Sequence, residues 1–216
     1  MTREQNQAIA ILLPQAAREI RAQLEGGHGD PLRYLTKLDA LLKSEAEIQT
    51  AAVALLRRRE LASPHAGPIA QAIVDEASRK QQRAKSRGER SGPPPTWAVD
   101  VAANSRPLPG GIVAVWWSAA GNNLSRAQAG KSQGLGLMPG LPDLEVLAEG
   151  AGFHIEMKSK RGRLGLVQSA VASAFTGGAG RRVYECRSIC SVAEVLVNAL
   201  GYHIRTCAKR SPQSST

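Results

Sequence analysis

Apolar positions follow a helical spacing in the first third of the chain. They recur three or four residues apart, as in the stripe Ile48, Ala52, Leu55 and Leu56. This spacing predicts helices at residues 5–24, 31–42, 45–59 and 68–80. Pro14 leaves open whether the first of them is one kinked helix or two short helices. Ser44 and Glu47 have the spacing of a capping box, which predicts the start of the third helix.

The C-terminal half instead contains short β-branched and apolar runs separated by turn residues, which is the pattern of strands. Strands are expected at residues 112–117, 143–148, 153–158 and 182–187, and helices at 166–175 and 192–200. Residues 149–152 have the composition of a hairpin turn between the second and third strands. These elements predict an α/β fold, with a mixed central sheet flanked by helices and a helical region before it. The strand at 112–117 is expected to be buried.

Composition divides the chain further. Residues 79–96 are polar, basic and proline-rich, and they read as a linker or exposed loop. We therefore expect a helical region at 1–78, this linker, an α/β domain at 97–208 and a disordered tail at 209–216. The longest apolar runs are far shorter than the ~20 residues that span a bilayer. No signal-peptide pattern follows Met1, so a cytoplasmic protein without a membrane partner is expected.

The charge is strongly basic and unevenly distributed. The 216 residues include 28 Lys and Arg against 18 Asp and Glu, a net charge of +10. Residues 1–78 have a net charge of −1, so the excess lies in 79–96 and in 97–216. Such an excess favours a polyanion such as nucleic acid, although solubility or an anionic membrane surface would also account for it. Only eight aromatic residues are present, which argues against a base-stacking platform for single strands.

Two carboxylates and one lysine stand where strands should bring them together. Glu156 and Lys158 are two residues apart on one expected strand, so they share a face, and a hairpin places Asp143 beside them. This grouping suits metal-assisted phosphodiester hydrolysis, because Mg²⁺ prefers hard oxygen ligands and needs only one or two carboxylates. The backbone carbonyl of Met157 is a further candidate ligand. Lys158 could orient or deprotonate the attacking water, or balance charge on the phosphate.

Two neighbouring residues have more than one interpretation. Glu145 could be a third ligand, since it lies two residues after Asp143, but a partner for a nearby Lys or Arg is favoured. His154 lies two residues before Glu156 and can share its face. A structural role for His154 is favoured over metal binding.

Five motifs occur in order in this region: Gly140, Pro142-Asp143, Glu156 with Lys158, Gly162-Arg163-Leu164, and Gln168. This ordered set resembles the virus-type replication-repair nuclease (VRR-NUC) domain of the PD-(D/E)xK superfamily, as in phage and bacterial proteins. The resemblance covers residues 112–200, and 44–58 form a further candidate segment. It implies a restriction-endonuclease-like core.

The resemblance also implies roles for individual residues. Asp143 and Glu156 would hold Mg²⁺ or Mn²⁺, Lys158 would be the catalytic lysine, and Gln168 would position the lysine, water or phosphate. Glu45 matches a glutamate on an early helix of the family and is a candidate metal-site residue. Its alternative is a carboxylate that stabilises a helix N-terminus. Sequence-independent contacts to DNA phosphates are expected, with exposed loop charge as the alternative, from Arg126, Lys131, Lys160, Arg161 and Arg163.

Together these features predict a Mg²⁺- or Mn²⁺-dependent DNA endonuclease, a hydrolase acting on duplex, branched, flap or junction DNA in replication, repair or recombination. It would act at the nucleoid or in a phage-infected cell. A homodimer would let two active sites meet a symmetric junction. The alternative is a non-catalytic DNA-binding accessory protein on a nuclease fold. Sequence-specific cutting is a weaker third hypothesis, because residues 1–110 contain no recognisable base-reading element.

Overall fold

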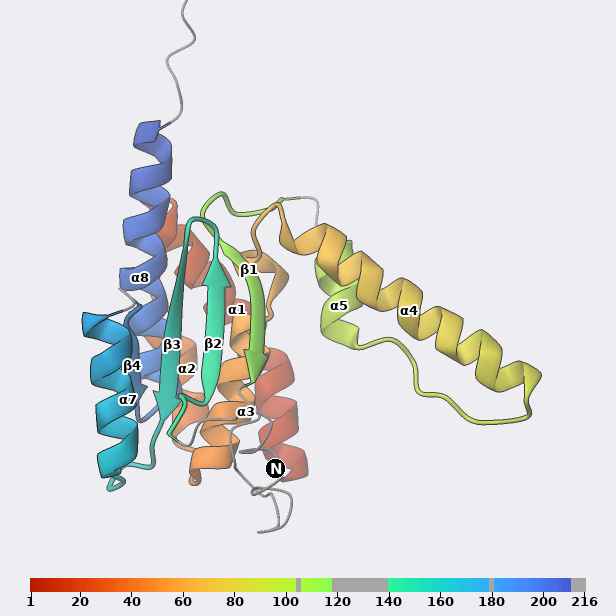
Figure 1. Cartoon of the computed structure of the whole chain (residues 1–216), viewed down its shortest axis with the longest axis horizontal. Helices are drawn as coiled ribbons and strands as arrows, with labels where there is room; N and C mark the ends of the chain where they lie inside the picture. The colour runs from red at the N-terminus through yellow and green to blue at the C-terminus, as the bar shows by residue number, and fades with distance from the viewer. Residues whose placement is uncertain (104–105, 118–139, 179–180, 211–216) are drawn as a thin grey trace, which may run out of the picture.

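The protein is an α/β structure with a helical N-terminal side (Figure 1). The computed structural model describes residues 1–103, 106–117, 140–178 and 181–210. Within these ranges it contains seven α-helices, one short 3-10 helix and a four-stranded mixed sheet. The predicted fold class, a mixed sheet with helical cover, is therefore confirmed. No helix in these ranges is long and apolar enough to cross a membrane.

Three helices form the N-terminal layer: α1 Arg3–Leu24, α2 Leu32–Asp39 and α3 Glu45–Leu56. Pro14 lies inside α1, which is one helix and not two. The proline removes one backbone donor, but buried side chains on both sides of it, including Leu13 and Ala17, keep the helix packed. Helix α3 ends earlier than expected and is followed by a 3-10 helix, η1 Arg59–Leu61.

The predicted capping box at the start of α3 is confirmed. The Ser44 hydroxyl accepts a hydrogen bond from the backbone N–H of Glu47 at 3.3 Å, and the Glu47 carboxylate accepts one from the N–H of Ser44 at 3.0 Å. Hydrogen bonds from the backbone of Lys43, the side chain of Gln5 and the backbone of Ser44 lower the pKa of Glu47 to about 2. The cap therefore also ties α3 to α1, because Gln5 belongs to α1.

The sheet has the order β1-β2-β3-β4. Its strands are β1 Ile112–Trp117, β2 Leu144–Ala148, β3 Ala151–Met157 and β4 Val183–Cys186. β1, β2 and β3 are antiparallel, and β4 is parallel to β3. The turn between β2 and β3 is two residues long, and its Gly150 has φ +89°, a conformation that glycine adopts without strain. The prediction of a buried first strand is wrong in part, because β1 lies at the sheet edge and Trp116 is 40% exposed.

Helices cover the sheet and connect its parallel strands. α7 Leu166–Gly177 links β3 to β4, and α8 Ile189–Arg210 follows β4 and packs with α1, α2 and α3 (Figure 1). One hydrophobic core contains residues of the N-terminal helices, such as Ile20, together with Ile155 of β3 and Leu196 of α8. The first 60 residues thus share their core with the sheet. α8 extends to Arg210, so residues 209 and 210 of the expected tail are helical, and 211–216 lie outside the described ranges.

A helical arm projects from this body (Figure 1). It consists of α4 Ala66–Ser86 and α5 Thr96–Ala102, which pack together in a small separate core. α4 continues past its expected end at Lys80, so residues 79–86 of the expected linker are helical. Ala, Gln, Lys and Arg in this stretch all favour helix, and the chain leaves the helix before Gly88, whose φ is +69°. The predicted loop is therefore confined to residues 87–95.

The capping box generates a stability prediction. Ser44→Ala removes the acceptor of the Glu47 N–H, so the free energy of unfolding should fall by about 1 kcal/mol. Urea unfolding followed by circular dichroism measures this loss. The matched control, Ser173→Ala at an exposed position of α7, should leave the midpoint nearly unchanged. Equal midpoints for the two variants would show that the cap does not stabilise the protein.

Candidate active site

The two predicted carboxylates lie side by side at one end of the sheet. Leu144 of β2 pairs with Ile155 of β3, so Asp143 and Glu156 occupy the next position along the two strands. Both are buried, with exposed fractions of 7% and 3%. The backbone N–H of Met157 donates a 2.8 Å hydrogen bond to Oδ2 of Asp143. This bond fixes Asp143 against the end of β3.

Lys158 and Gln168 converge on one oxygen of Glu156. Nζ of Lys158 and Nε2 of Gln168 each lie 2.5 Å from Oε1 of Glu156. Gln168 is in the first turn of α7, and its own Oε1 accepts a hydrogen bond from the backbone N–H of Gly165 at 3.0 Å. The start of α7 is therefore fastened to Glu156. Three of the residues predicted from the motifs thus form one hydrogen-bonded group.

Gly140 shows why the approach to Asp143 requires glycine. Its backbone angle φ is +82°, a value that residues other than glycine rarely adopt. A Cβ atom there would also lie 2.9 Å from a methyl group of Val167 and 3.1 Å from the backbone nitrogen of Gln168. The glycine thus lets the segment before β2 pack directly on the start of α7, beside the residue that bonds to Glu156.

Glu45 reaches the same site from α3. Its Oε1 lies 3.9 Å from Nζ of Lys158, and its Oε2 accepts a hydrogen bond from the backbone N–H of Ser159 at 3.3 Å. Glu47, and not Glu45, forms the cap of α3. The roughly 50 residues between α3 and β1 do not prevent this contact, because most of them form the projecting arm. The placement keeps Glu45 beside the predicted catalytic lysine, while its role as a metal ligand stays a prediction.

The site is electrostatically asymmetric, since three carboxylates surround one ammonium group. Burial raises the pKa of Glu156 above its ordinary value, and the charge of Asp143 adds to this, against the opposing effect of Lys158. Burial acts to lower the pKa of Lys158. The hydrogen bond and charge of Glu156, with the charges of Glu45 and Asp143, outweigh burial and raise that pKa. The excess of negative charge suits a cation.

Carboxylate oxygens are the ligands that Mg²⁺ and Mn²⁺ prefer, so the chemistry of Asp143 and Glu156 fits such an ion. The N–H and the carbonyl of one strand residue point to the same side of the strand. Because the N–H of Met157 donates to Asp143, its carbonyl is expected on the side of Asp143 as well. In the ranges that the structure describes, no group of three or more Asp, Glu, His or Cys side chains is arranged to hold one metal ion. The two buried carboxylates, Asp143 and Glu156, are the candidate metal donors at this site.

The two residues with open interpretations have structural contacts. Glu145 forms an ion pair with Arg181, with 2.6 Å between Oε1 and the guanidinium nitrogen, as the favoured reading expected. His154 is buried, and its ring stacks on Phe175 of α7 with centroids 4.7 Å apart. Burial lowers the pKa of His154. His154 thus packs α7 on the sheet, and Glu145 holds the segment just before β4 beside β2.

Arg187 is a site residue that sequence reasoning missed. One of its guanidinium nitrogens donates to the backbone carbonyls of Ser159, Lys160 and Gly162 at 3.1, 3.3 and 2.6 Å. These bonds hold the loop that follows Lys158, which carries the exposed side chains of Lys160, Arg161 and Arg163. Arg187 follows β4, belongs to no motif and also forms an ion pair with the neighbouring Glu185. Nothing in the local sequence indicates its contacts to the loop carbonyls. The other predicted phosphate contacts, Arg126 and Lys131, lie outside the described residues.

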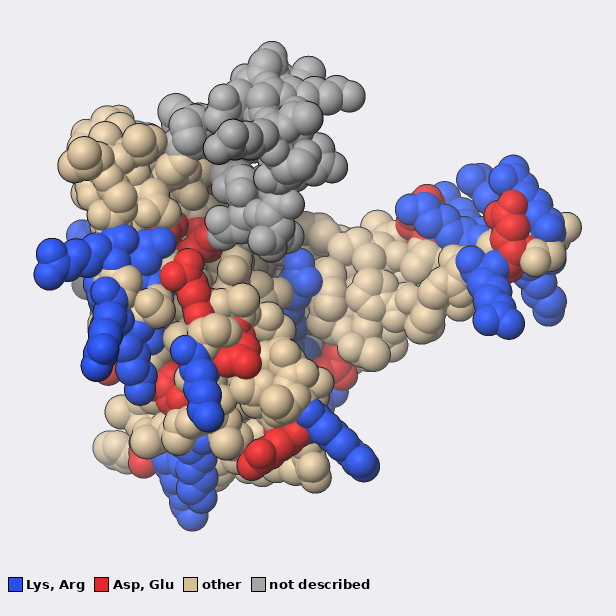
Figure 2. Space-filling view, turned by 90° about the horizontal axis from the view of Figure 1, so that it is seen from below, with Lys and Arg blue, Asp and Glu red and all other residues tan. Residues whose placement is uncertain are grey.

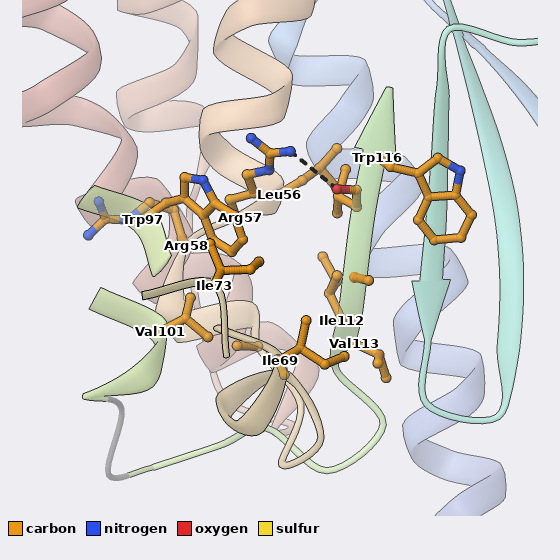
Figure 3. Close-up of a pocket in the computed structure, with 14 residues that line it drawn as sticks. Leu56, Arg57, Arg58, Ile69, Ile73, Trp97, Val101, Ile112, Val113 and Trp116 are labelled. Atoms are coloured by element: carbon orange, nitrogen blue, oxygen red, sulfur yellow. Dashed lines mark hydrogen bonds between the residues drawn. The ribbon is translucent and has the colours of Figure 1, made fainter. Parts of the chain in front are cut away.

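An apolar pocket of about 200 Å³ lies at the base of the arm (Figure 3). Arg57, which follows α3, donates to the Val115 carbonyl at 3.3 Å, and its guanidinium lies 4.7 Å from the ring centroid of Trp97. Among the described residues that line it, none is Asp or Glu. Arg57 is twelve residues after Glu45, or about 18 Å along a helix. The pocket is therefore distinct from the site at the end of the sheet.

Comparisons of the chain with protein-family models, with curated proteins and with solved structures find no match.

The buried ion pair generates a pH-dependent prediction. Lys158→Met leaves the Glu156 carboxylate buried without its cation, which should lower the free energy of unfolding by about 3–5 kcal/mol near neutral pH. A buried lone carboxylate has a raised pKa, so folding takes up a proton. The loss should therefore grow as pH rises above about 4.3, the ordinary pKa of glutamate. Urea unfolding in metal-free buffer at about pH 5 and pH 8 measures both effects.

The double variant Lys158→Met with Glu156→Gln is the control for this prediction. It removes the buried charge as well as its partner, so the added pH dependence should disappear and part of the stability should return. A loss of stability that is the same at both pH values, with and without Glu156→Gln, would contradict the ion-pair interpretation.

The Arg187 contacts generate a further prediction. Arg187→Met should destabilise the protein by about 1.5 kcal/mol, the low end for hydrogen bonds to a charged donor, because the side chain is partly exposed. Amide hydrogen exchange should become faster at residues 159–162 and change little in α1. Arg182→Met, at an exposed position just before β4, is the matched control. Unchanged exchange at 159–162 would show that Arg187 does not hold the loop.

Proposed function

We propose that this protein is a divalent-metal-dependent nuclease that hydrolyses phosphodiester bonds in DNA, with a core of the PD-(D/E)xK type similar to VRR-NUC domains. The observation that carries the proposal is the convergence of Asp143, Glu156 and Lys158 in a buried group at one end of the sheet. A buried set of two carboxylates and a lysine is an expensive way to stabilise a fold, since apolar residues of similar volume often do as well. The presence of this costly group therefore favours a chemical role.

The arrangement of the elements supports the same proposal. A helix carrying Glu45 precedes three antiparallel strands, then a helix carrying Gln168, then a strand parallel to the third. Gln168 lies on a helix, Glu156 lies on β3, and Asp143 and Lys158 lie directly before β2 and directly after β3. Gln168 and Glu45, which are distant from the central motif in sequence, both contact it directly.

Asp143 and Glu156 would hold Mg²⁺ or Mn²⁺, with the Met157 carbonyl as a further oxygen donor. Such an ion lowers the pKa of a bound water and neutralises charge that builds on the phosphate. The excess of negative charge at the site supports cation binding, because Asp143 and Glu156 repel each other.

The remaining site residues would orient these groups and the DNA. Lys158 can donate to a phosphate oxygen or to the attacking water from its position beside Glu156. Gln168 keeps the Glu156 carboxylate in place from the first turn of α7. Lys160, Arg161 and Arg163 are exposed on the loop that directly follows Lys158, where they can contact phosphates on either side of the cleaved bond.

The resemblance to VRR-NUC domains also suggests a substrate and a cellular process. Branched, flap or junction DNA would be the preferred substrate, in replication, repair or recombination, at the nucleoid or in a phage-infected cell. A homodimer would present two such sites to a symmetric junction.

A non-catalytic DNA-binding accessory protein is the second candidate function. One observation favours it: the Glu156 carboxylate already has Lys158 and Gln168 as hydrogen-bond partners. In that case the buried group would stabilise the fold only, and DNA would bind without being cut.

A cleavage assay distinguishes the two functions. The wild-type protein should cut at least one DNA in a panel of linear, flap, splayed and four-way substrates when Mg²⁺ or Mn²⁺ is present, and none in EDTA. Asp143→Asn and Glu156→Gln, which keep side-chain shape, should each lower the rate by about a hundredfold or more, because loss of even an outer partner of a metal ligand costs 10–100-fold.

Glu194→Gln, at an exposed position of α8, is the control and should cut at the wild-type rate. Thermal unfolding of all three variants confirms that they are folded. Binding to DNA with no metal-dependent product would support the accessory function. Cleavage by Asp143→Asn and Glu156→Gln at the wild-type rate would rule out this active site.

A further inference from the structure

The outer half of α4 is not needed for packing. The last residues of α4 that pack against the small core of the arm are Ile73 and Val74, and this core includes Ala98 and Val101 of α5. The twelve residues that follow Val74, up to Ser86, extend about 18 Å further along the helix axis. In this stretch, only Ala84 is buried. Apart from Ala84, the side chains of this stretch are not buried, so they are not needed to hold α4 to the body.

This outer arm, residues 79–90, is densely basic. It contains six Lys or Arg residues and one acidic residue, whereas residues 60–78 contain no Lys or Arg. Figure 2 shows the consequence: blue side chains gather at the far end of the arm, separated from those of the body by a stretch without them. The protein thus presents two basic surfaces, one on the body and one on the outer arm.

The charges of the outer arm have few partners within the chain. Glu76 is shared between Arg79 and Lys80 at 3.9 and 3.7 Å. Within the described part of the chain, no ion pair is formed by four further exposed residues: Arg83, Lys85, Arg87 and Arg90.

The fold does not account for this concentration of charge. Arg79, Arg83 and Arg87 are spaced four residues apart, so they repel one another along one side of the helix. The helix dipole favours cations in the last turn, such as Arg83 and Lys85, but it does not explain Arg90 in the loop beyond the helix end. A polyanion bound along the outer arm would relieve the repulsion.

We infer that the outer arm is a second DNA-contacting surface, which grips the phosphate backbone of a duplex at a distance from the site of cleavage. The inference rests on the proposed function in taking DNA as the polyanion. An anionic membrane fits less well, because interfacial helices need an apolar face and residues 79–92 contain no apolar side chain except Ala84. Since the two basic surfaces are separated, a long duplex can reach both and a short one only one.

The test measures binding and not cleavage. In the full chain carrying Glu156→Gln, without divalent metal, fluorescence anisotropy gives the affinity for duplexes of about 10, 20 and 40 base pairs, at several salt concentrations. The arm variant carries Arg79→Gln, Arg83→Gln, Arg87→Gln and Arg90→Gln. The control variant removes the same charge from exposed positions of α1 and α2: Arg3→Gln, Arg18→Gln, Arg33→Gln and Lys37→Gln.

The arm variant should bind the longest duplex roughly tenfold or more weakly at low salt, and its log K against log salt should be less steep by about 3 to 4, since each lost phosphate contact removes about 0.9. Its affinity for the shortest duplex should match that of the parent. The control should keep the parent's dependence on duplex length. Circular dichroism should show equal helix content in all proteins.

Equal binding of the arm and control variants to every duplex would overturn the inference. So would a loss of binding to phosphatidylserine vesicles with DNA binding unchanged, which would assign the outer arm to a membrane. The outcome is separable from the proposed nuclease activity. If the wild-type protein never cuts DNA but binds long duplexes through the outer arm, the proposed nuclease activity is disproved and the inference about the outer arm still holds.

Discussion

The burial of the Glu156 carboxylate is the constraint on which the site depends. A buried charge is stable only when it is paired and hydrogen-bonded, and Lys158 and Gln168 meet this need at a single oxygen. Each of these two partners also connects Glu156 to a helix. Gln168 fixes the start of α7, and Lys158 has Glu45 of α3 beside it. The same interaction therefore assembles the ends of two strands and the starts of two helices.

Helix α3 connects this site with the arm. Glu45 at its first residue contacts the backbone of Ser159, and Arg57 just after its last residue contacts the β1 carbonyl of Val115 and lies over Trp97 of α5. Its buried face, including Ile48 and Leu55, belongs to the core that it shares with the sheet. A packed helix transmits position along its whole length, so α3 sets the relation between the site and the base of the arm.

Contacts between residues close in sequence could be predicted, whereas contacts between distant segments could not. The capping box of Ser44 and Glu47 and the turn at Gly150 could be read directly, because their hydrogen bonds and torsion angles involve only neighbouring residues. The pairing of Asp143 with Glu156 could also be predicted, because a hairpin sets its own register. The roles of Glu45 and Gln168 came from a resemblance. Arg187 was missed, because the loop carbonyls that it contacts lie 25–28 residues earlier in the chain.

Periodicity and local spacing are enough to predict the α/β class, most of the helices and strands, and the candidate carboxylates and lysine. Three features could be learned only from the folded chain: Glu45 lies beside Lys158, β1 is an edge strand, and residues 79–86 extend a projecting helix. The reason is physical. Packing between distant segments determines which side chains are buried together, and this depends on all elements at once and not on any local pattern.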